Sequence, residues 1–409
     1  MFKRIIYITV FFVFFCNTYS CSSNNDSTSA SEEATGLSDK MVVRKAGEDL
    51  FISAKMDKTT DIVYWFKKCM FNKLYTFYRV SIISNQFDQP NDVFDKAAGT
   101  TLNSTFSDNI GPFCISGHGW CGGNHPYVDG KTLTAYNLSY SIIVNGKEFT
   151  EDTSVTSNDV EIKVVNAIMN PAKPQVIDNV TTLKDTLCTE YVDYHIYNNN
   201  IQVSVKHKFM NDEAVDIERY YGMQSMFAGE THTLTANGKY TQWTPQSEVS
   251  TFLKKDYPLF RRFIEKNNIA YQSAYLFNTG LGRHNEVSDD DFIFIGNSNG
   301  KTYHKLIGSR KHVKGDEQEW SGVYTWFVTP IVDNEGLFCY EGIIDKKNVI
   351  FLDCKKALKI NLVLPEKYKK KTLYMLENNP YVEVTRGKAK SSDINIVATK
   401  PASCVISFR

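Results

Sequence analysis

The sequence predicts an all-β protein, in which a large antiparallel β-sandwich precedes a smaller C-terminal β-sandwich. Turn dipeptides such as Asn-Gly recur between runs in which apolar and polar residues alternate, and this combination indicates tight hairpins. Aromatic residues are abundant, with 23 tyrosines and 26 phenylalanines, and they favour strands. Repeated hairpins with little helix build antiparallel sheets, which bury one face by stacking on each other.

The first 40 residues are expected to form a targeting signal and a tether rather than a folded element. Two basic residues precede the apolar run IIYITVFFVFF, which has the length of a signal peptide and is short for a membrane span. The small residues that lead to Cys21 resemble the signal of a Bacteroides-type surface lipoprotein. The resemblance implies removal of residues 1–20, lipidation of Cys21 and a polar tether over residues 21–40. We therefore expect an exported protein at the outer membrane or cell surface, or otherwise in the periplasm or secreted.

Residues 41–357 are expected to form the large domain. The β-rich run LYTFYRVSIIS is followed by five segments that predict hairpins: SYSIIVNGKEF, YVDYHIYNNNIQVSVKHKF, THTLTANGKYTQW, FIFIGNSNGKTYHKLIG and LFCYEGIIDKKNVIFLDC. Only the segment SEVSTFLKKDYPLFRRFIEKNN has helix-like spacing, and Pro258 interrupts it. Residues 358–409 are expected to form the small sandwich from about five short strands, with ASCVISF as a closing edge strand.

Net charge and cysteine content bear on nucleic-acid binding and on disulfide formation. The chain has 46 basic and 46 acidic residues, so nothing indicates nucleic acid as a partner. An exported location permits disulfides. The cysteines after the tether are odd in number, which leaves at least one unpaired, and we expect several to be buried free thiols. They are Cys69, Cys114, Cys121, Cys188, Cys339, Cys354 and Cys404.

The segment CISGHGWCGGNHPY, residues 114–127, holds the densest chemistry in the chain. It could form a zinc site from two cysteines and two histidines, a disulfide between its cysteines, or a glycine-rich turn with polar decoration. A dinucleotide loop is disfavoured, because no helix can follow it. The fourth interpretation is a substrate-cleft loop, whose glycines let the backbone approach a ligand closely. The residues concerned are Cys114, His118, Trp120, Cys121, Asn124, His125 and Tyr127.

The wider segment SDNIGPF…SGHGWCGGNHPYVDGKTLTAYNLSY resembles a pattern in bacterial and phage proteins attached to polysaccharide depolymerases. The resemblance covers about 40 residues, and it implies a glycan context. The hairpin-rich body is also similar in style to the double-sheet supersandwich folds of polysaccharide lyases and sugar-mutarotase-like proteins, which is an analogy of architecture.

A second cluster lies in VSVKHKFMNDEAVDIERYYGMQSMF. Alternation places His207 on an apolar strand face, so it is either a satisfied core histidine or a functional one. Alternation also places Arg219 and Tyr221 on the face of Val215 and Ile217, with Gln224 beyond them and Asp216 and Glu218 on the opposite face. An arginine there could pair in the core or bind an acidic sugar.

A lyase acting on a uronate-containing glycan would use such groups. Asn124, Arg219 or Arg283 would neutralise the substrate carboxylate, His125 or His207 would take the proton, and Tyr221 would protonate the leaving oxygen. Other groups that could contact the sugar are His118, Trp120, Tyr127, Gln224, Arg283, His284, Tyr303 and His304. An exposed loop is the alternative interpretation for Arg283 and His284, and strand packing for Tyr303 and His304. His195, His232 and His312 show no supporting cluster.

Two other functions stay open. A non-catalytic surface protein would bind glycan by stacking sugars on its aromatic residues. A glycoside hydrolase would need two carboxylates, for which SDDDF and GDEQEW are candidates that also fit solvated loops. No cofactor or metal is indicated, although SDDDF could hold a structural calcium ion. The expected partners are a polysaccharide and, through the lipid anchor only, a membrane.

Overall fold

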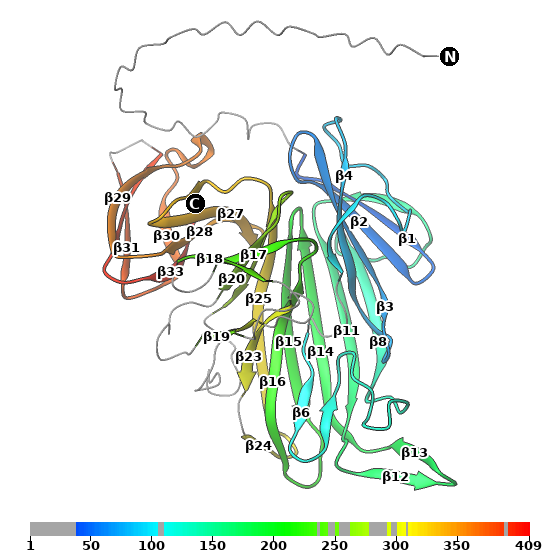
Figure 1. Ribbon diagram of the computed structural model, residues 1–409. Coiled ribbons are helices and arrows are strands. Elements are labelled where there is room, and N and C mark those ends of the chain that lie inside the picture. The colour runs from blue at the N-terminus through cyan, green and yellow to red at the C-terminus, as the bar shows by residue number, and fades with distance from the viewer. Residues whose placement is uncertain are drawn as a thin grey trace, which may run out of the picture.

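The computed structural model describes residues 38–104, 110–234, 238–243, 250–252, 262–277, 293–295, 301–307, 310–387 and 392–409. These residues are almost entirely antiparallel strands, and the only helical turn among them is η3 (Glu366–Tyr368), so the predicted all-β class is confirmed. None of the described segments is a helix with the length and apolar character that a membrane span requires. Figure 1 shows several sheets stacked face to face.

Three sheets build the large domain. The six-stranded sheet has the order β10 (Ser154–Ser157), β1 (Met41–Ala46), β2 (Asp49–Lys55), β3 (Thr60–Cys69), β4 (Leu74–Ser84) and β5 (Thr100–Ser104). The ten-stranded sheet has the order β18 (Tyr240–Trp243), β17 (Thr231–Leu234), β20 (Arg262–Lys266), β21 (Tyr271–Leu276), β25 (Glu317–Phe327), β15 (Asn200–Phe209), β14 (Thr186–Tyr197), β11 (Val160–Met169), β8 (Ala135–Val144) and β9 (Lys147–Glu148).

The seven-stranded sheet carries the segments that the sequence singled out. Its order is β19 (Ser250–Phe252), β22 (Ile293–Ile295), β23 (Lys301–Ile307), β16 (Val215–Met226), β6 (Phe113–Ile115) and β7 (Gly119–Cys121), and β24 (Arg310–His312) also pairs with β16. A separate two-stranded hairpin, β12 (Pro174–Ile177) and β13 (Val180–Leu183), projects from one end of the molecule (Figure 1).

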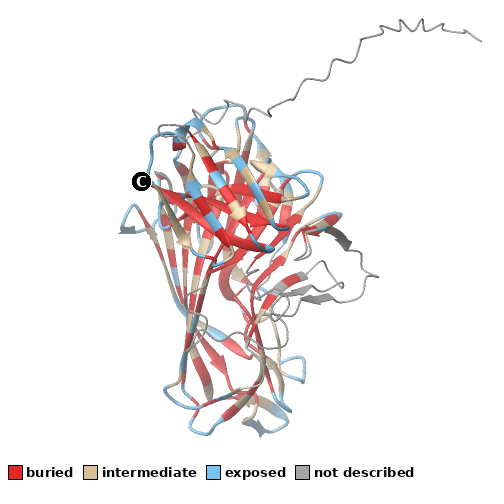
Figure 2. Ribbon diagram, turned by 90° about the vertical axis from the view of Figure 1, so that its left-hand side faces the viewer, coloured by how far each residue is buried: buried red, intermediate tan, exposed pale blue. Residues whose placement is uncertain are grey.

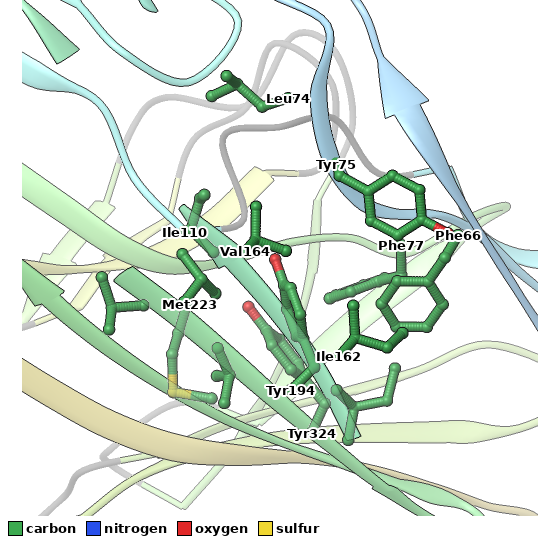
Figure 3. Close-up of a cluster of buried hydrophobic side chains, with 14 of the residues drawn as sticks. Phe66, Leu74, Tyr75, Phe77, Ile110, Ile162, Val164, Tyr194, Met223 and Tyr324 are labelled. Atoms are coloured by element: carbon green, nitrogen blue, oxygen red, sulfur yellow. The ribbon is translucent and has the colours of Figure 1, made fainter. Parts of the chain in front are cut away.

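One hydrophobic core joins the inner faces of these three sheets. It forms because alternate residues of each strand point inward, and the close-up in Figure 3 shows Phe66 and Phe77 of the six-stranded sheet beside Tyr194 and Tyr324 of the ten-stranded sheet. Phe66 and Tyr194 pack edge to face with their ring centroids 5.5 Å apart. Buried residues run along the strands, whereas exposed residues gather mainly in turns (Figure 2).

The predicted hairpins are confirmed where they are described. Val144 pairs with Lys147 across the Asn145-Gly146 turn, and both turn residues have positive φ, which asparagine and glycine tolerate. Ile344 pairs with Lys347 in the same way. The segment with helix-like spacing contributes β19 and β20, so the helical interpretation is wrong for its described residues. Pairing with neighbouring strands outweighs local periodicity there.

The C-terminal sandwich has two sheets. One has the order β26 (Val332–Asp333), β27 (Leu337–Ile344), β28 (Lys347–Cys354), β33 (Ala402–Phe408) and β30 (Leu373–Glu377); the other has the order β29 (Leu358–Val363), β32 (Asp393–Ala398) and β31 (Val382–Arg386). The predicted edge position of β33 is wrong, because β28 and β30 pair with its two sides. Pairing of β28 with β33 crosses residue 358, where the sequence places the domain boundary.

Candidate functional site

The glycine-rich segment folds into a short β-hairpin. Phe113 pairs with Cys121, Cys114 with Trp120 and Ile115 with Gly119. Because neighbouring residues of a strand point to opposite faces, Phe113 and Cys121 enter the core, and Cys114 and Trp120 face outward. Gly117 and Gly119 close the turn with φ of 73° and 80°, which side-chain-bearing residues rarely adopt.

This hairpin separates the four side chains of the zinc interpretation. Cys121 is fully buried on the inner face, Cys114 lies on the outer face and His118 is exposed at the tip. No group of metal-ligating side chains is found among the described residues. Cys114 and Cys121 are free thiols rather than a disulfide, and all seven described cysteines are buried and unpaired, as expected for several of them.

A β-bulge in β16 determines which of its residues lie beside this hairpin. Ile217 pairs with Ile115, but the next residue of β6, Cys114, pairs with Arg219, so Glu218 is an extra residue. The alternation therefore shifts by one position after Ile217. Val215 and Ile217 still face the core, but Arg219 and Tyr221 do not share their face, which corrects the prediction.

Tyr220 takes the inner position instead. It is 1% exposed, stacks on Phe113 at 4.5 Å between ring centroids and donates a hydrogen bond to the carbonyl oxygen of Ile110. Glu218 and Arg219, adjacent in sequence, both reach the outer side and form an ion pair there.

Five side chains form what we call the outer cluster: Trp120, His125, Glu218, Arg219 and Tyr221. The indole of Trp120 stacks with the His125 ring at 5.2 Å and with the Tyr221 ring at 5.6 Å between centroids. The Arg219 guanidinium carbon lies 5.9 Å from the centroid of the Trp120 ring. The structure thus brings Trp120 and His125 of one segment beside Arg219 and Tyr221 of another.

Charge in the outer cluster is set by the ion pair. The Glu218 carboxylate, followed by the Tyr221 hydroxyl, raises the pKa of Arg219, so the guanidinium is cationic throughout the usual pH range. Arg219 in turn lowers the pKa of Glu218. Burial and the nearby Glu218 raise the pKa of the Cys114 thiol, which disfavours the reactive thiolate. The side chain of Arg219 remains 39% exposed, so a solute anion has access to it.

Backbone contacts hold the loop that follows the hairpin. The amide N–H of Phe71 donates to the Asn124 side-chain oxygen at 2.9 Å, and the Asn72 side chain donates to the carbonyl oxygens of Gly123 and His125. The side-chain oxygen of Asn124 is therefore bonded to the β3–β4 turn. Tyr127 packs against a small cluster that includes Met169 and Leu183.

His207 lies on the inner side, away from the outer cluster. It is fully buried, with Nε2 2.9 Å from the Glu190 carboxylate and Nδ1 3.2 Å from the Gln318 amide nitrogen. The other oxygen of Glu190 accepts from Asn166 at 2.9 Å. Each ring nitrogen has a partner, which is the arrangement of a satisfied core histidine. A substrate cannot reach His207 in this structure.

Of the remaining predicted site residues, some are buried, some lie outside the described residues and one is exposed. Gln224 is 5% exposed and His304 is fully buried beside Phe263. Cys21, Arg283, His284, the side chain of Tyr303 and the SDDDF segment lie outside the described residues. In GDEQEW, Glu317 pairs with Lys206 at 2.8 Å between exposed side chains.

His195 has the supporting groups that the sequence did not reveal. Its Nε2 lies 3.5 Å from the Glu161 carboxylate and its Nδ1 lies 3.4 Å from the Tyr197 hydroxyl. Glu161 is the direct cross-strand partner of His195 between β11 and β14. Only the strand register brings them together, so the sequence around His195 carried no signal beyond the Tyr197 spacing.

No family model matches the sequence, and no curated protein matches it either. Among solved structures, the chain is similar to the galactosidase domain of the α-galactosidase–sucrose kinase AgaSK, with a TM-score of 0.41, 11% identity, and coverage of 70% of this chain and 42% of that one. It is also similar to the Slr1438 protein from Synechocystis sp. PCC 6803, with a TM-score of 0.32, 8% identity, and coverage of 68% and 96%.

A third similar structure is a polysaccharide lyase, with a TM-score of 0.27, 7% identity, and coverage of 89% of this chain and 45% of that one. The chain thus spans less than half the length of the galactosidase-domain and lyase chains. The likeness to all three is one of β-sheet architecture.

Proposed function

We propose that the protein is a polysaccharide lyase that cleaves a uronate-containing glycan at the outer cluster. The observation that carries this proposal is the position of the Arg219 guanidinium, which lies over the Trp120 ring and interacts with the Tyr221 hydroxyl. A cation beside aromatic rings suits an acidic sugar, because the rings stack on its apolar face and the guanidinium binds its carboxylate.

The proposed reaction is a β-elimination. A base removes the proton on the carbon next to the uronate carboxylate, a carbon–carbon double bond forms, and the bond to the glycosidic oxygen breaks. Arg219 would stabilise the negative charge that develops on the carboxylate. Tyr221 would protonate the leaving oxygen, and His125, stacked on Trp120, is the nearest candidate for the base.

Glycan binding without cleavage is the second candidate, and the Glu218–Arg219 ion pair favours it. A carboxylate already paired with the guanidinium reduces the charge that Arg219 can offer to a transition state, yet leaves it able to hydrogen-bond an incoming anion. The aromatic cluster of Trp120, His125 and Tyr221 would also serve a sugar-binding surface.

An absorbance assay separates the two candidates. The full chain is mixed with polygalacturonate, alginate or a glycosaminoglycan, and the ultraviolet absorbance of unsaturated uronates is followed. A lyase raises this absorbance, and Arg219→Gln and Tyr221→Phe lower the rate by about 100-fold or more. Arg44→Gln, which removes a half-buried, ion-paired arginine of the six-stranded sheet, leaves the rate unchanged. Retardation in a gel containing the polymer, without new absorbance, would identify a binder.

We also infer that Cys21 anchors the protein to a membrane. The polar segment after Cys21 and the apolar run before it support this. Cells that express the full chain should carry it in the membrane fraction with incorporated fatty acid, and Cys21→Ser should release it. Unlabelled, soluble protein from the unaltered gene would contradict the anchor.

A further inference from the structure

The outer face of the ten-stranded sheet is divided into a covered part and an open part. The C-terminal sandwich covers β20, β21 and the part of β25 from Val323 onward, where Ile264, Tyr275 and Val323 pack against Tyr340 and Phe351. The buried Arg262–Asp353 ion pair also joins the two units. Beyond Gln202, which hydrogen-bonds Asp345 at 2.9 Å, the outer face of β15, β14, β11 and β8 carries half-buried and exposed polar residues.

A row of three serines, one lysine and one aspartate crosses the part of this face that the C-terminal sandwich leaves open. The strand register makes Ser141, Lys163, Asp193, Ser204 and Ser321 successive cross-strand neighbours from β8 to β25. None of the three serine hydroxyls hydrogen-bonds to a residue that the structure describes. We call these five residues the serine row.

Larger side chains flank the serine row on both sides. Tyr191, two residues before Asp193 on β14, is 42% exposed. His195, two residues after Asp193, pairs with Glu161, and Lys163 lies 3.1 Å from the same carboxylate. An exposed aromatic ring beside free hydroxyls is the combination that stacks and hydrogen-bonds a sugar.

Asp193 is the acidic member of the serine row. Its carboxylate accepts no hydrogen bond from any described residue, although it is half-buried. Burial raises its pKa, while the charges of Lys163 and His195 oppose that shift. A partly desolvated carboxylate without donors is costly, and the hydroxyl groups of a bound sugar would supply them.

We propose that the serine row with Tyr191 is a second carbohydrate-binding surface, which takes a neutral polysaccharide chain lying across the strands. Tyr191 stacks a sugar ring, Asp193 accepts hydrogen bonds from sugar hydroxyls, and the serines provide further contacts. We expect a neutral polysaccharide because the lysines of this face are already paired with carboxylates, Lys163 with Glu161 at 3.1 Å and Lys206 with Glu317 at 2.8 Å.

This surface is independent of the outer cluster. The inner faces of the seven-stranded and ten-stranded sheets meet in one core, where Phe113 packs on His207 and Phe209. Their outer faces are therefore on opposite sides of the sandwich. The second surface does not rest on the proposed function, and each can fail alone.

Affinity electrophoresis of the full chain tests it, in gels that contain xylan, galactan, a mixed-linkage glucan or polygalacturonate. We expect retardation by at least one neutral polymer, and a rise in the apparent Kd of about tenfold or more for Tyr191→Ala and for Asp193→Asn. Phe87→Ala and Asp88→Asn, which remove an exposed aromatic and an exposed acid elsewhere, are the matched controls and should bind as the wild type does.

Arg219→Gln should also retain this binding, which separates the result from the outer cluster. Thermal unfolding of each variant shows that the fold is intact, and Asp193→Asn is nearly isosteric. The proposal is overturned if none of the neutral polymers retards the wild type, or if both variants bind as tightly as the wild type.

Discussion

Strand β16 has two sides that differ in almost every physical respect. Ile217 and Tyr220 face the core, where Tyr220 accepts a hydrogen bond from the Trp320 indole at 2.8 Å and donates one to the carbonyl of Ile110. Arg219 and Tyr221 lie on the other side beside Trp120, where the arginine side chain is 39% exposed and Tyr221 is 8% exposed. The bulge at Glu218 shifts the alternation by one position, so that Tyr220 faces the core and Arg219 and Tyr221 do not.

Position relative to the core, rather than residue type, distinguishes structural from functional candidates. The sequence offers both His207 and His125 as the base of a lyase reaction. His207 has both nitrogens occupied in the core, whereas His125 stacks on a half-buried indole at the surface. The inner side of β16 should therefore govern stability and the outer side should govern ligand binding.

The largest expected effect concerns Glu265, whose carboxylate meets the buried Ser225 hydroxyl of β16 at 2.6 Å. Burial raises the pKa of Glu265 from an ordinary 4.5 to about 8. Between these values the folded protein holds a proton that the unfolded chain has lost, so the free energy of unfolding falls as pH rises. The decline is about 1.4 kcal/mol per pH unit, on the order of 5 kcal/mol in all.

Glu265→Gln removes this titration and keeps a hydrogen-bonding group of similar shape. Denaturant unfolding of both proteins from pH 4 to 9 should show the variant gaining stability relative to the wild type as pH rises. The two curves should converge at acid pH. Parallel curves across the whole range would contradict a buried, proton-holding Glu265.

Removal of the His207 ring should be the next largest effect. His207→Ala leaves the buried Glu190 carboxylate with only Asn166 of its two described partners and opens a cavity beneath Phe113 and Tyr220, which should cost about 3–5 kcal/mol. Arg219→Ala on the outer side should cost about 1 kcal/mol or less, since its ion pair is solvated. Urea unfolding measures the free energy of unfolding of both variants. Equal losses would contradict the assignment of His207 to the core and of Arg219 to the outer side.

Adjacent tyrosines give a smaller but closely matched test. Tyr220→Phe removes the acceptor of the Trp320 N–H and the donor to Ile110, so it should lose about 1–3 kcal/mol of unfolding free energy. Tyr221→Phe should lose less than about 1 kcal/mol, because its hydroxyl interacts with the partly exposed Arg219 guanidinium. The reverse order would mean that the bulge is misplaced by one residue.

Thiol chemistry gives the smallest expected effect. Glu218→Gln removes a charge that raises the pKa of Cys114, so alkylation of Cys114 at pH 8 should speed up. Arg219→Gln removes a charge that lowers this pKa and should slow the reaction. Peptide mass spectrometry after brief labelling follows Cys114, with the fully buried Cys121 as the unreactive internal control.

Local sequence signals predicted much of the fold. Asn145-Gly146 and similar turns fixed hairpins, and alternation identified the strands, because both depend on neighbours in the chain. The bulge at Glu218 could not be predicted, because it depends on pairing with Cys114, far away in sequence. The same reason hid the partners of His195: Glu161 lies opposite it only in the folded register.

The candidate site was predicted in part. Trp120, His125, Arg219 and Tyr221 do come together from two distant segments. Asn124 and His207 do not join them, because one bonds the backbone of Phe71 and the other completes a core network. Such bonds are made with residues on other strands, and composition alone does not reveal them.

Calorimetric titration of galacturonate oligomers, free and methyl-esterified, into the wild type and Arg219→Gln tests the outer cluster most directly. If Arg219 binds the carboxylate, the wild type prefers the free acid by about tenfold, the variant loses that preference, and the ester binds both proteins alike. Arg44→Gln should match the wild type. An unchanged preference for the free acid in Arg219→Gln would contradict the assignment of this face as the acidic-sugar site.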